Sequence, residues 1–236
     1  MTRRGWALFG ALSVIWGLPY LFIRVAVASM APVVLVGVRT ALASLVLLPL
    51  ALRAGALRPV LSRWPWVLTF AAVEVFVPFG LLSWAEVHLT SSLTGLLVAA
   101  VPLMAAVLGV ALRLPDRIRP GRADRGRLAG LVLGFAGVAA LVGVDLRGGD
   151  LLAALAVLVA AAGYALGPVI LDRRLAALPG VGLTVVAMGV TSLAYLPWVV
   201  ARWPAAGSVP WQAWASAAVL GVVCSAGSVL ATRRAA

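Results

Sequence analysis

An apolar run of about twenty residues, 93–112, is the feature that most constrains how this chain can fold. The polar segment Thr90-Ser91-Ser92 precedes the run, and Arg113 ends it. Twenty helical residues at 1.5 Å each cover about 30 Å, which is the thickness of the hydrocarbon core of a bilayer. Pro102 lies inside the run, and a membrane helix tolerates proline because neighbouring helices can satisfy the backbone groups that it frees. The run therefore predicts a transmembrane helix.

Apolar segments of similar length recur along the whole chain. The composition agrees, because 64% of the residues are hydrophobic and only 11% are charged, whereas soluble domains are about 45–50% apolar and about 25% charged. The loops between the segments are short, so consecutive helices should run antiparallel. The sequence predicts an all-α, polytopic bundle of about eight transmembrane helices. The predicted spans are residues 6–28, 33–52, 66–86, 92–112, 128–145, 150–171, 181–201 and 213–231.

The arginines alternate between the two sides of the membrane that these spans define. If the N-terminus is inside, 15 of the 19 basic residues lie on inner segments, and only Arg147 and Arg202 lie on outer loops. Basic inner loops orient membrane helices, so we expect a multi-pass protein of the inner cell membrane with both termini cytoplasmic. The topology accounts for the net charge of +12 without a nucleic-acid partner. The inner arginines are Arg3, Arg4, Arg53, Arg58, Arg63, Arg113, Arg117, Arg119, Arg122, Arg125, Arg127, Arg173, Arg174, Arg233 and Arg234.

An internal repeat becomes visible when the chain is shifted along itself by 148 residues. The shift aligns Trp16 with Tyr164, Ser44 with Ser192, Pro49 with Pro197, and Trp66 with Trp214. Each repeat then holds five helices, and an odd number makes the second copy enter the membrane from the opposite side. We expect a first repeat at residues 5–148 and a second, incomplete repeat of three helices at residues 149–236.

Motifs spread over residues 5–225 give the chain a family resemblance. They are Trp16-Gly17, Pro32 followed by Arg39, Thr90-Ser91-Ser92-Leu93 leading to Pro102, the glycines Gly130, Gly134 and Gly137, and Gly149-Asp150. In order and spacing they resemble the EamA domain of the drug/metabolite transporter superfamily. The resemblance implies ten helices in two inverted five-helix repeats. It also implies a secondary transporter that exports small metabolites or drug-like solutes by alternating access.

The chain departs from the family pattern after Val223, where the resemblance implies two further helices. The departure leaves a second interpretation open. In it, the chain is a truncated, non-transporting membrane protein, or a subunit that needs a partner to complete its bundle.

Glu74 is the first candidate for the substrate cavity. It lies about nine residues into the third predicted span, near the middle of the bilayer, and Pro78 follows four positions later on the same helix face. Ionisable groups inside a span cost several kcal/mol and are functional candidates for that reason. We interpret Glu74 as a proton- or cation-responsive carboxylate. The alternative is a neutral carboxyl group that is hydrogen-bonded to a neighbouring helix.

Arg24 and Arg39 lie at similar depth near the outer face, on consecutive antiparallel helices. Arg39 is a second cavity candidate, because a guanidinium group binds carboxylates well. Arg24 and Glu86, which ends the third span on the same side, form a candidate outer gate. For Arg24 the alternative is a side chain that snorkels to the interface or forms a structural ion pair.

Four aromatic residues in or near the spans could line a cavity for hydrophobic substrates. They are Trp16, Tyr20, Trp84 and Tyr164, of which Trp16 and Tyr164 correspond in the repeat. The remaining tryptophans stand at span ends, where an interfacial belt accounts for them.

The residues needed for enzyme chemistry are scarce. The chain has one histidine, one cysteine and no lysine, whereas a metal site needs several such ligands and a phosphate-binding loop needs a lysine. We therefore predict no catalytic residues, no metal and no cofactor. The expected partners are a small-molecule substrate, the lipid bilayer and, in a homodimer, a second copy of the chain.

Overall fold

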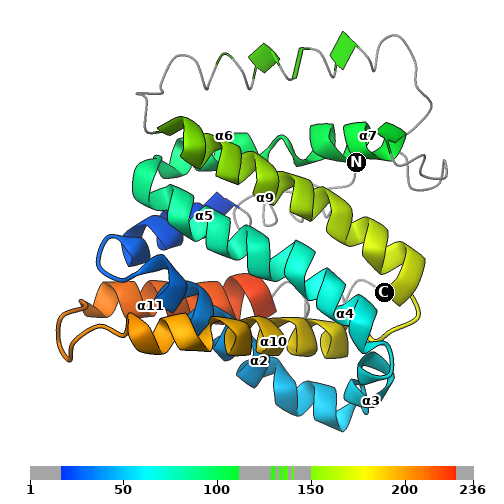
Figure 1. Cartoon of the computed structure of the whole chain (residues 1–236). Coiled ribbons are helices and arrows are strands. Elements are labelled where there is room, and N and C mark those ends of the chain that lie inside the picture. The colour runs from blue at the N-terminus through cyan, green and yellow to red at the C-terminus, as the bar shows by residue number, and fades with distance from the viewer. Residues whose placement is uncertain are drawn as a thin grey trace, which may run out of the picture. The chain divides into compact units, whose positions relative to one another are not determined.

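The computed structural model describes residues 17–111 and 150–226, together with scattered helical positions between 129 and 140. Helices and short connections make up these residues, and no strand occurs among them (Figure 1). The all-α prediction is confirmed. Five of the described helices are long and apolar enough to cross a membrane: Pro32–Arg53, Trp64–His88, Ser91–Gly109, Leu151–Leu175 and Gly180–Ala201. Shorter apolar helices run over Gly17–Val27 and Trp211–Val223.

The predicted spans agree closely with these helices. Seven of the eight overlap described helices, although residues 6–16 of the first and 227–231 of the eighth lie outside the described residues, as does most of the fifth, at 128–145. After Gly17–Val27, the elements are α2 (Pro32–Arg53), α3 (Leu57–Leu61), α4 (Trp64–Phe70), η1 (Ala71–Phe76), α5 (Val77–His88), α6 (Ser91–Val98), α7 (Val101–Ala111), α9 (Asp150–Ile170), η2 (Leu171–Leu175), α10 (Gly180–Ala201), α11 (Trp211–Val219) and η3 (Leu220–Ala226).

The fourth span differs from a regular helix at one point. Its two parts, α6 and α7, meet at a turn over residues 99–100, just before Pro102. Proline has no N–H to donate to the carbonyl four residues back, and its ring crowds that carbonyl, so the helix breaks there. At the other end, the Thr90 side chain accepts a hydrogen bond from the Leu93 N–H and caps α6.

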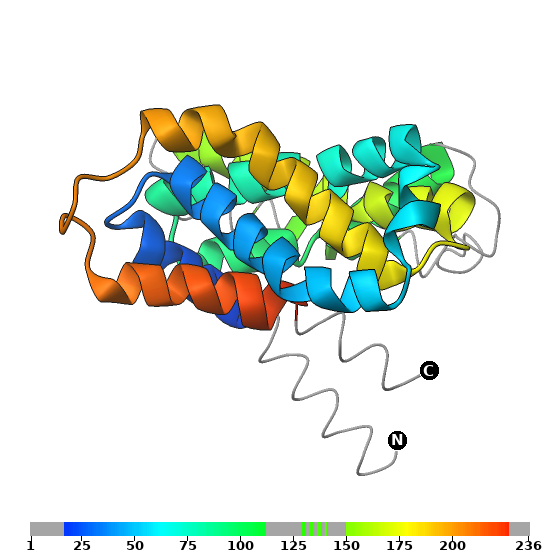
Figure 2. The same cartoon turned by 90° about the horizontal axis from the view of Figure 1, so that it is seen from below.

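The chain divides into two compact units. One, which we call the split unit, consists of Met1–Ser62 and Leu178–Ala236, and the other, the continuous unit, is Arg63–Ala177. In the split unit α2 packs along α10, and both Figure 1 and Figure 2 show these two helices side by side. The buried core of this unit has two clusters, one around Ile23, Leu35 and Leu220 and the other around Leu47 and Val185.

The continuous unit is built around α9. The long helix formed by α4, η1 and α5 packs against α9, as do α6 and α7. A cluster of buried side chains, among them Leu82, Leu97 and Val157, joins α5, α6 and α9. These elements carry the carboxyl group of Glu74 and its surroundings.

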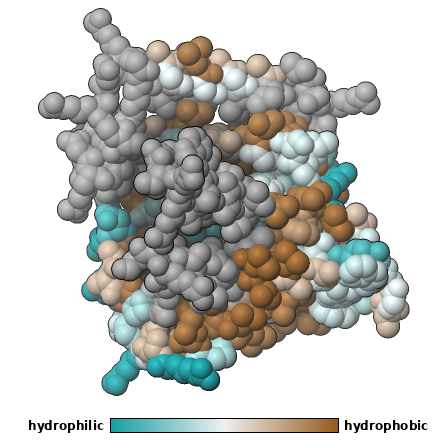
Figure 3. All heavy atoms as spheres, turned by 180° about the vertical axis from the view of Figure 1, so that it is seen from behind, coloured by the Kyte–Doolittle hydropathy of each residue, from teal (hydrophilic) through white to brown (hydrophobic). Residues whose placement is uncertain are grey.

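Large apolar side chains remain on the outward surface of the described helices, as the brown areas in Figure 3 show. Leu45, Leu193 and Val200 are each more than 60% exposed. A soluble monomer rarely exposes so much contiguous apolar surface. The surface suits contact with lipid, in agreement with the predicted membrane spans.

Candidate functional site

Glu74 lies in η1, a wide π-helical turn between α4 and α5. The Val77 N–H donates to the Ala72 carbonyl, five residues back. In a regular α-helix the next N–H would bond the Glu74 carbonyl, but residue 78 is proline and has no N–H. Single π-turns of this kind are frequent at functional sites. The helix therefore has an irregular turn at Glu74.

Two glycines of α9 bring its backbone against this turn. A Cβ added to Gly163 would lie 2.5 Å from the Val73 carbonyl oxygen and 3.0 Å from Pro78 Cγ. A Cβ added to Gly167, one helical turn later, would overlap Glu74 Oε2 and would lie 2.6 Å from Glu74 Cδ. Only a residue without a side chain leaves room for the Glu74 carboxyl group at this position.

The carboxyl group is held by packing. Oε2 of Glu74 is buried and has no hydrogen-bond partner within the described part of the chain. Buried polar atoms are nearly always hydrogen-bonded, and an exception calls for a physical explanation. A proton, a cationic group of a ligand or a water molecule could fill this role. The sequence identified Glu74 as a candidate, but it could not pair Glu74 with Gly163 and Gly167.

Two of the predicted aromatic residues belong to the same unit. Tyr164 lies one residue after Gly163 on α9 and is half-buried against the cluster that joins α5, α6 and α9. Trp84 packs against the same cluster, and its ring lies 4.7 Å from that of His88. Ten residues separate Trp84 from Glu74 along the helix, which is about 15 Å. Tyr164 is therefore near the turn that carries Glu74, and Trp84 is not.

Glu86, a residue of the predicted outer gate, is fully buried at the end of α5. Ser91 Oγ, in the first turn of α6, donates a hydrogen bond to Glu86 Oε2 at 3.1 Å. The carboxylate therefore contributes to the tight connection between α5 and α6.

The other predicted residues with described positions belong to the split unit. Arg39 is 5% exposed within α2, Tyr20 is half-buried, and Arg24 is exposed. Trp16 lies outside the described residues. The predicted site residues thus fall on different units: Glu74, Tyr164, Trp84 and Glu86 belong to the continuous unit, and Arg39, Tyr20 and Arg24 belong to the split unit.

The contact between α2 and α10 contains a pair of reciprocal hydrogen bonds. Ser44 Oγ donates to the Val185 carbonyl at 3.0 Å, and Ser192 Oγ donates to the Gly37 carbonyl at 3.2 Å. The offset of 148 residues relates the two serines to each other and the two acceptors to each other. It also carries the bounds of α2, residues 32–53, onto those of α10, residues 180–201. The repeat had aligned the serines, but only the structure reveals their contact.

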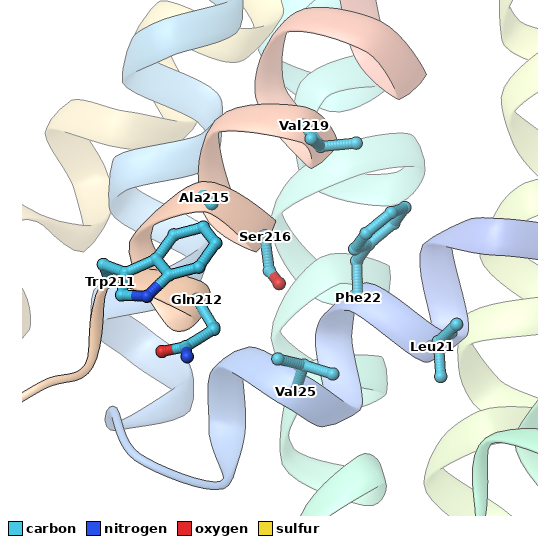
Figure 4. Close-up of a pocket in the computed structure, with 8 residues that line it drawn as sticks. All are labelled: Leu21, Phe22, Val25, Trp211, Gln212, Ala215, Ser216 and Val219. Atoms are coloured by element: carbon cyan, nitrogen blue, oxygen red, sulfur yellow. The ribbon is translucent and has the colours of Figure 1, made fainter.

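A shallow apolar pocket of about 290 Å³ lies in the split unit, between the helix Gly17–Val27 and α11. Figure 4 shows Phe22 and Val25 rising from the first helix towards α11, with Trp211 and Gln212 at one end. None of the predicted site residues lines this pocket. Its lining is almost entirely apolar, so it offers no chemistry for a polar substrate.

A metal centre has no support in the described residues, which contain no group of three or more histidine, cysteine, aspartate or glutamate side chains.

The comparisons with known proteins agree with the helical membrane fold. The model of the EamA-like transporter family matches residues 4–143. No curated protein matches the chain, and no solved structure matches it. The matched segment includes Glu74, Arg39 and Glu86 and covers more than half of the 236 residues. The apolar helices and the order of the sequence motifs agree with this match. The chain therefore belongs to the EamA-like transporter family of the drug/metabolite transporter superfamily.

Proposed function

We propose that the chain exports a small metabolite or drug-like solute by alternating access, with Glu74 as the group that responds to a proton or a cation. The observation that carries this proposal is the position of Glu74, in a π-turn of a membrane span and against the backbone of Gly167. Family membership supports transport, and the export direction follows the expectation from the resemblance.

The chemistry of the carboxyl group supports its role in coupling. An ionised carboxylate inside a span is costly unless a partner neutralises it. Oε2 has no hydrogen-bond partner among the residues that the structure describes. A proton or a cationic substrate group could each neutralise Glu74, so the two would compete for it. Competition of this kind couples solute movement to a proton gradient, because release of one favours binding of the other.

The internal repeat supplies the mechanical part of the proposal. We propose that residues 5–148 and 149–236 are inverted copies, and the reciprocal bonds of Ser44 and Ser192 support an antiparallel, two-fold contact between them. The π-turns also support the relation between the two copies. Shifted by 148 residues, η1 at 71–76 overlaps η3 at 220–226. Inverted copies are related by a pseudo-two-fold axis in the membrane plane, so they allow two states, open to opposite sides of the membrane, which is the basis of alternating access.

The backbones of α2 and α10 approach closely, so these two helices can act as the pivot between the two copies. A Cβ added to Gly37 would overlap Val199, and a Cβ added to Gly189 would lie 3.1 Å from Ser44 Oγ. We further propose that both termini face the cytoplasm of the inner membrane, as the arginine asymmetry predicts.

Transport by the purified chain in liposomes tests the proposal. Ethidium and a panel of labelled amino acids serve as probes, with an imposed pH gradient and a pH-sensitive dye to follow proton movement. We expect solute-dependent proton flux that Glu74→Gln abolishes and Glu74→Asp reduces. Asp172→Asn is the matched control, because Asp172 is an exposed carboxylate of the same unit.

Two results would count against this function. Equal, pH-dependent flux by Glu74→Gln and by the unmodified chain would exclude Glu74 from coupling. Absence of flux for every probe, with the protein folded, would favour the non-transporting interpretation.

A further inference from the structure

A cluster of cationic and aromatic side chains lies where the third span begins. Arg63 Nη1 donates a hydrogen bond to the Arg174 carbonyl oxygen at 2.8 Å. The guanidinium carbon of Arg174 lies 4.2 Å from the centroid of the Trp66 ring. We call Arg63, Trp66 and Arg174 the arginine cluster. It joins the start of α4 to the end of η2 within the continuous unit, although 111 residues separate Arg63 from Arg174 along the chain.

The contacts within the cluster leave its positive charge available. The two side chains bond a carbonyl oxygen and stack on an indole ring, and in the described residues neither of these contacts involves a carboxylate. Arg173 adds a further positive charge next in sequence, beside the negative charge of Asp172. Like charges on residues that contact each other repel, and a bound anion would offset that repulsion.

The geometry also leaves hydrogen-bond donors free to meet an anion. A guanidinium group carries five N–H donors in one plane. The guanidinium carbon of Arg174 lies over the Trp66 ring, and both arginines are exposed, so N–H donors remain accessible to a ligand. The helix Trp64–His88 begins at the same place, and its N-terminal dipole favours negative charge there. Three independent features thus point to one anion.

The surroundings select the kind of anion. Trp64 and Trp66 are 61% and 39% exposed, as expected for tryptophans at the level of lipid headgroups. One turn deeper, Leu68 and Leu171 are 38% and 37% exposed, and they offer apolar surface to acyl chains. A free phosphate ion would use the arginines but not these leucines.

We propose that the arginine cluster binds the phosphate group of an anionic phospholipid, with the acyl chains along Leu68 and Leu171. The arginine asymmetry explains why basic residues stand at this end of the spans. It does not explain why Arg63 and Arg174 are joined to each other and to Trp66. The site is independent of Glu74 and of the transported solute.

Native mass spectrometry of the purified chain tests the proposal with phosphatidylglycerol and phosphatidylcholine as probes. We expect at least about five-fold tighter binding of phosphatidylglycerol, the factor that corresponds to about 1 kcal/mol for one basic residue near an anionic surface. Arg63→Gln and Arg174→Gln should each remove this preference. Arg202→Gln is the matched control, because Arg202 is an exposed arginine at the other end of a span, and it should keep the preference.

Several outcomes would overturn the assignment. Equal binding of the two lipids would show that no anionic site exists. Equal losses in Arg202→Gln and Arg174→Gln would reveal general charge attraction. Inorganic phosphate that displaces phosphatidylglycerol at equal concentration would identify a phosphate-ion site rather than a lipid site. Circular dichroism and thermal unfolding in phosphatidylcholine, unchanged between variants, would establish that each variant is folded.

Discussion

Substitution of Gly167 by alanine should displace the Glu74 carboxyl group directly. The added Cβ would overlap Oε2 and would lie 2.6 Å from Cδ and 3.2 Å from Cβ of Glu74. Carbon atoms pack best at about 3.5–4.0 Å, so Cδ is about 1 Å too close. Rotation of the carboxyl group relieves the overlap with Oε2, but the short approach to Glu74 Cβ also requires a shift of η1 or α9.

The expected change in the free energy of unfolding follows from two opposing effects. Overpacking of a buried contact costs about 1–3 kcal/mol. Alanine in place of glycine inside a helix stabilises the folded chain by roughly 0.5–1 kcal/mol. We therefore expect Gly167→Ala to lower the stability of the chain by about 1–2 kcal/mol. At this chain length, that corresponds to a fall in Tm of about 2–8 °C.

Thermal unfolding in detergent measures this loss, and a double-mutant cycle with Glu74→Ala isolates its cause. In the Glu74→Ala background the overlaps with Oε2 and Cδ are absent and only the 3.2 Å approach to the Cβ of residue 74 remains, so most of the overpacking cost should disappear and the coupling energy should be about 1–2 kcal/mol. Gly180→Ala is the control, because a Cβ there has no atom within 4 Å. An equal cost of Gly167→Ala with and without Glu74 would refute the proposed contact.

Two further predictions concern hydrogen bonds between helices. Ser44→Ala and Ser192→Ala should each cost about 0.6 kcal/mol, a typical value for a hydrogen bond between membrane helices, whereas Thr184→Ala, whose hydroxyl bonds within its own helix, should cost less. Unfolding in mixed micelles measures all three, and clearly unequal losses for the two serines would contradict the two-fold contact. Glu86→Ala should lower stability by about 2–3 kcal/mol, because it leaves a buried cavity and the Ser91 hydroxyl without its acceptor. A thermal unfolding curve identical to that of the unmodified chain would exclude this structural role.

The helices could be predicted from the sequence because membrane spans have a length set by the bilayer. The prediction for 181–201 differs from the observed α10, Gly180–Ala201, by a single residue at one end. The place of Glu74 inside a long apolar helix, Trp64–His88, could be predicted for the same reason. Its contact with Gly167 could not, because hydropathy contains no information about which helices are neighbours.

Other features of the site were hidden for different reasons. The arginines at 63 and 174 look like ordinary topological signals in the sequence, and only the fold brings them together at Trp66. The offset of 148 residues aligned Ser44 with Ser192, but serine is common in membrane helices. Their shared role emerges when the acceptors, Gly37 and Val185, follow the same offset.

The division into a split unit and a continuous unit has a consequence for biosynthesis. Residues 63–177 form a unit without interruption, whereas α2 has to wait for α10 before its own unit can close. At a translation rate of about 5–20 residues per second, this wait lasts roughly 6–30 s. During that time Ser44 and Gly37, which contact α10 in the folded chain, face lipid or the insertion machinery. A nascent chain that is halted once residue 177 has left the ribosome should therefore already hold a protease-resistant core made of the continuous unit, while its first two helices remain open to cleavage.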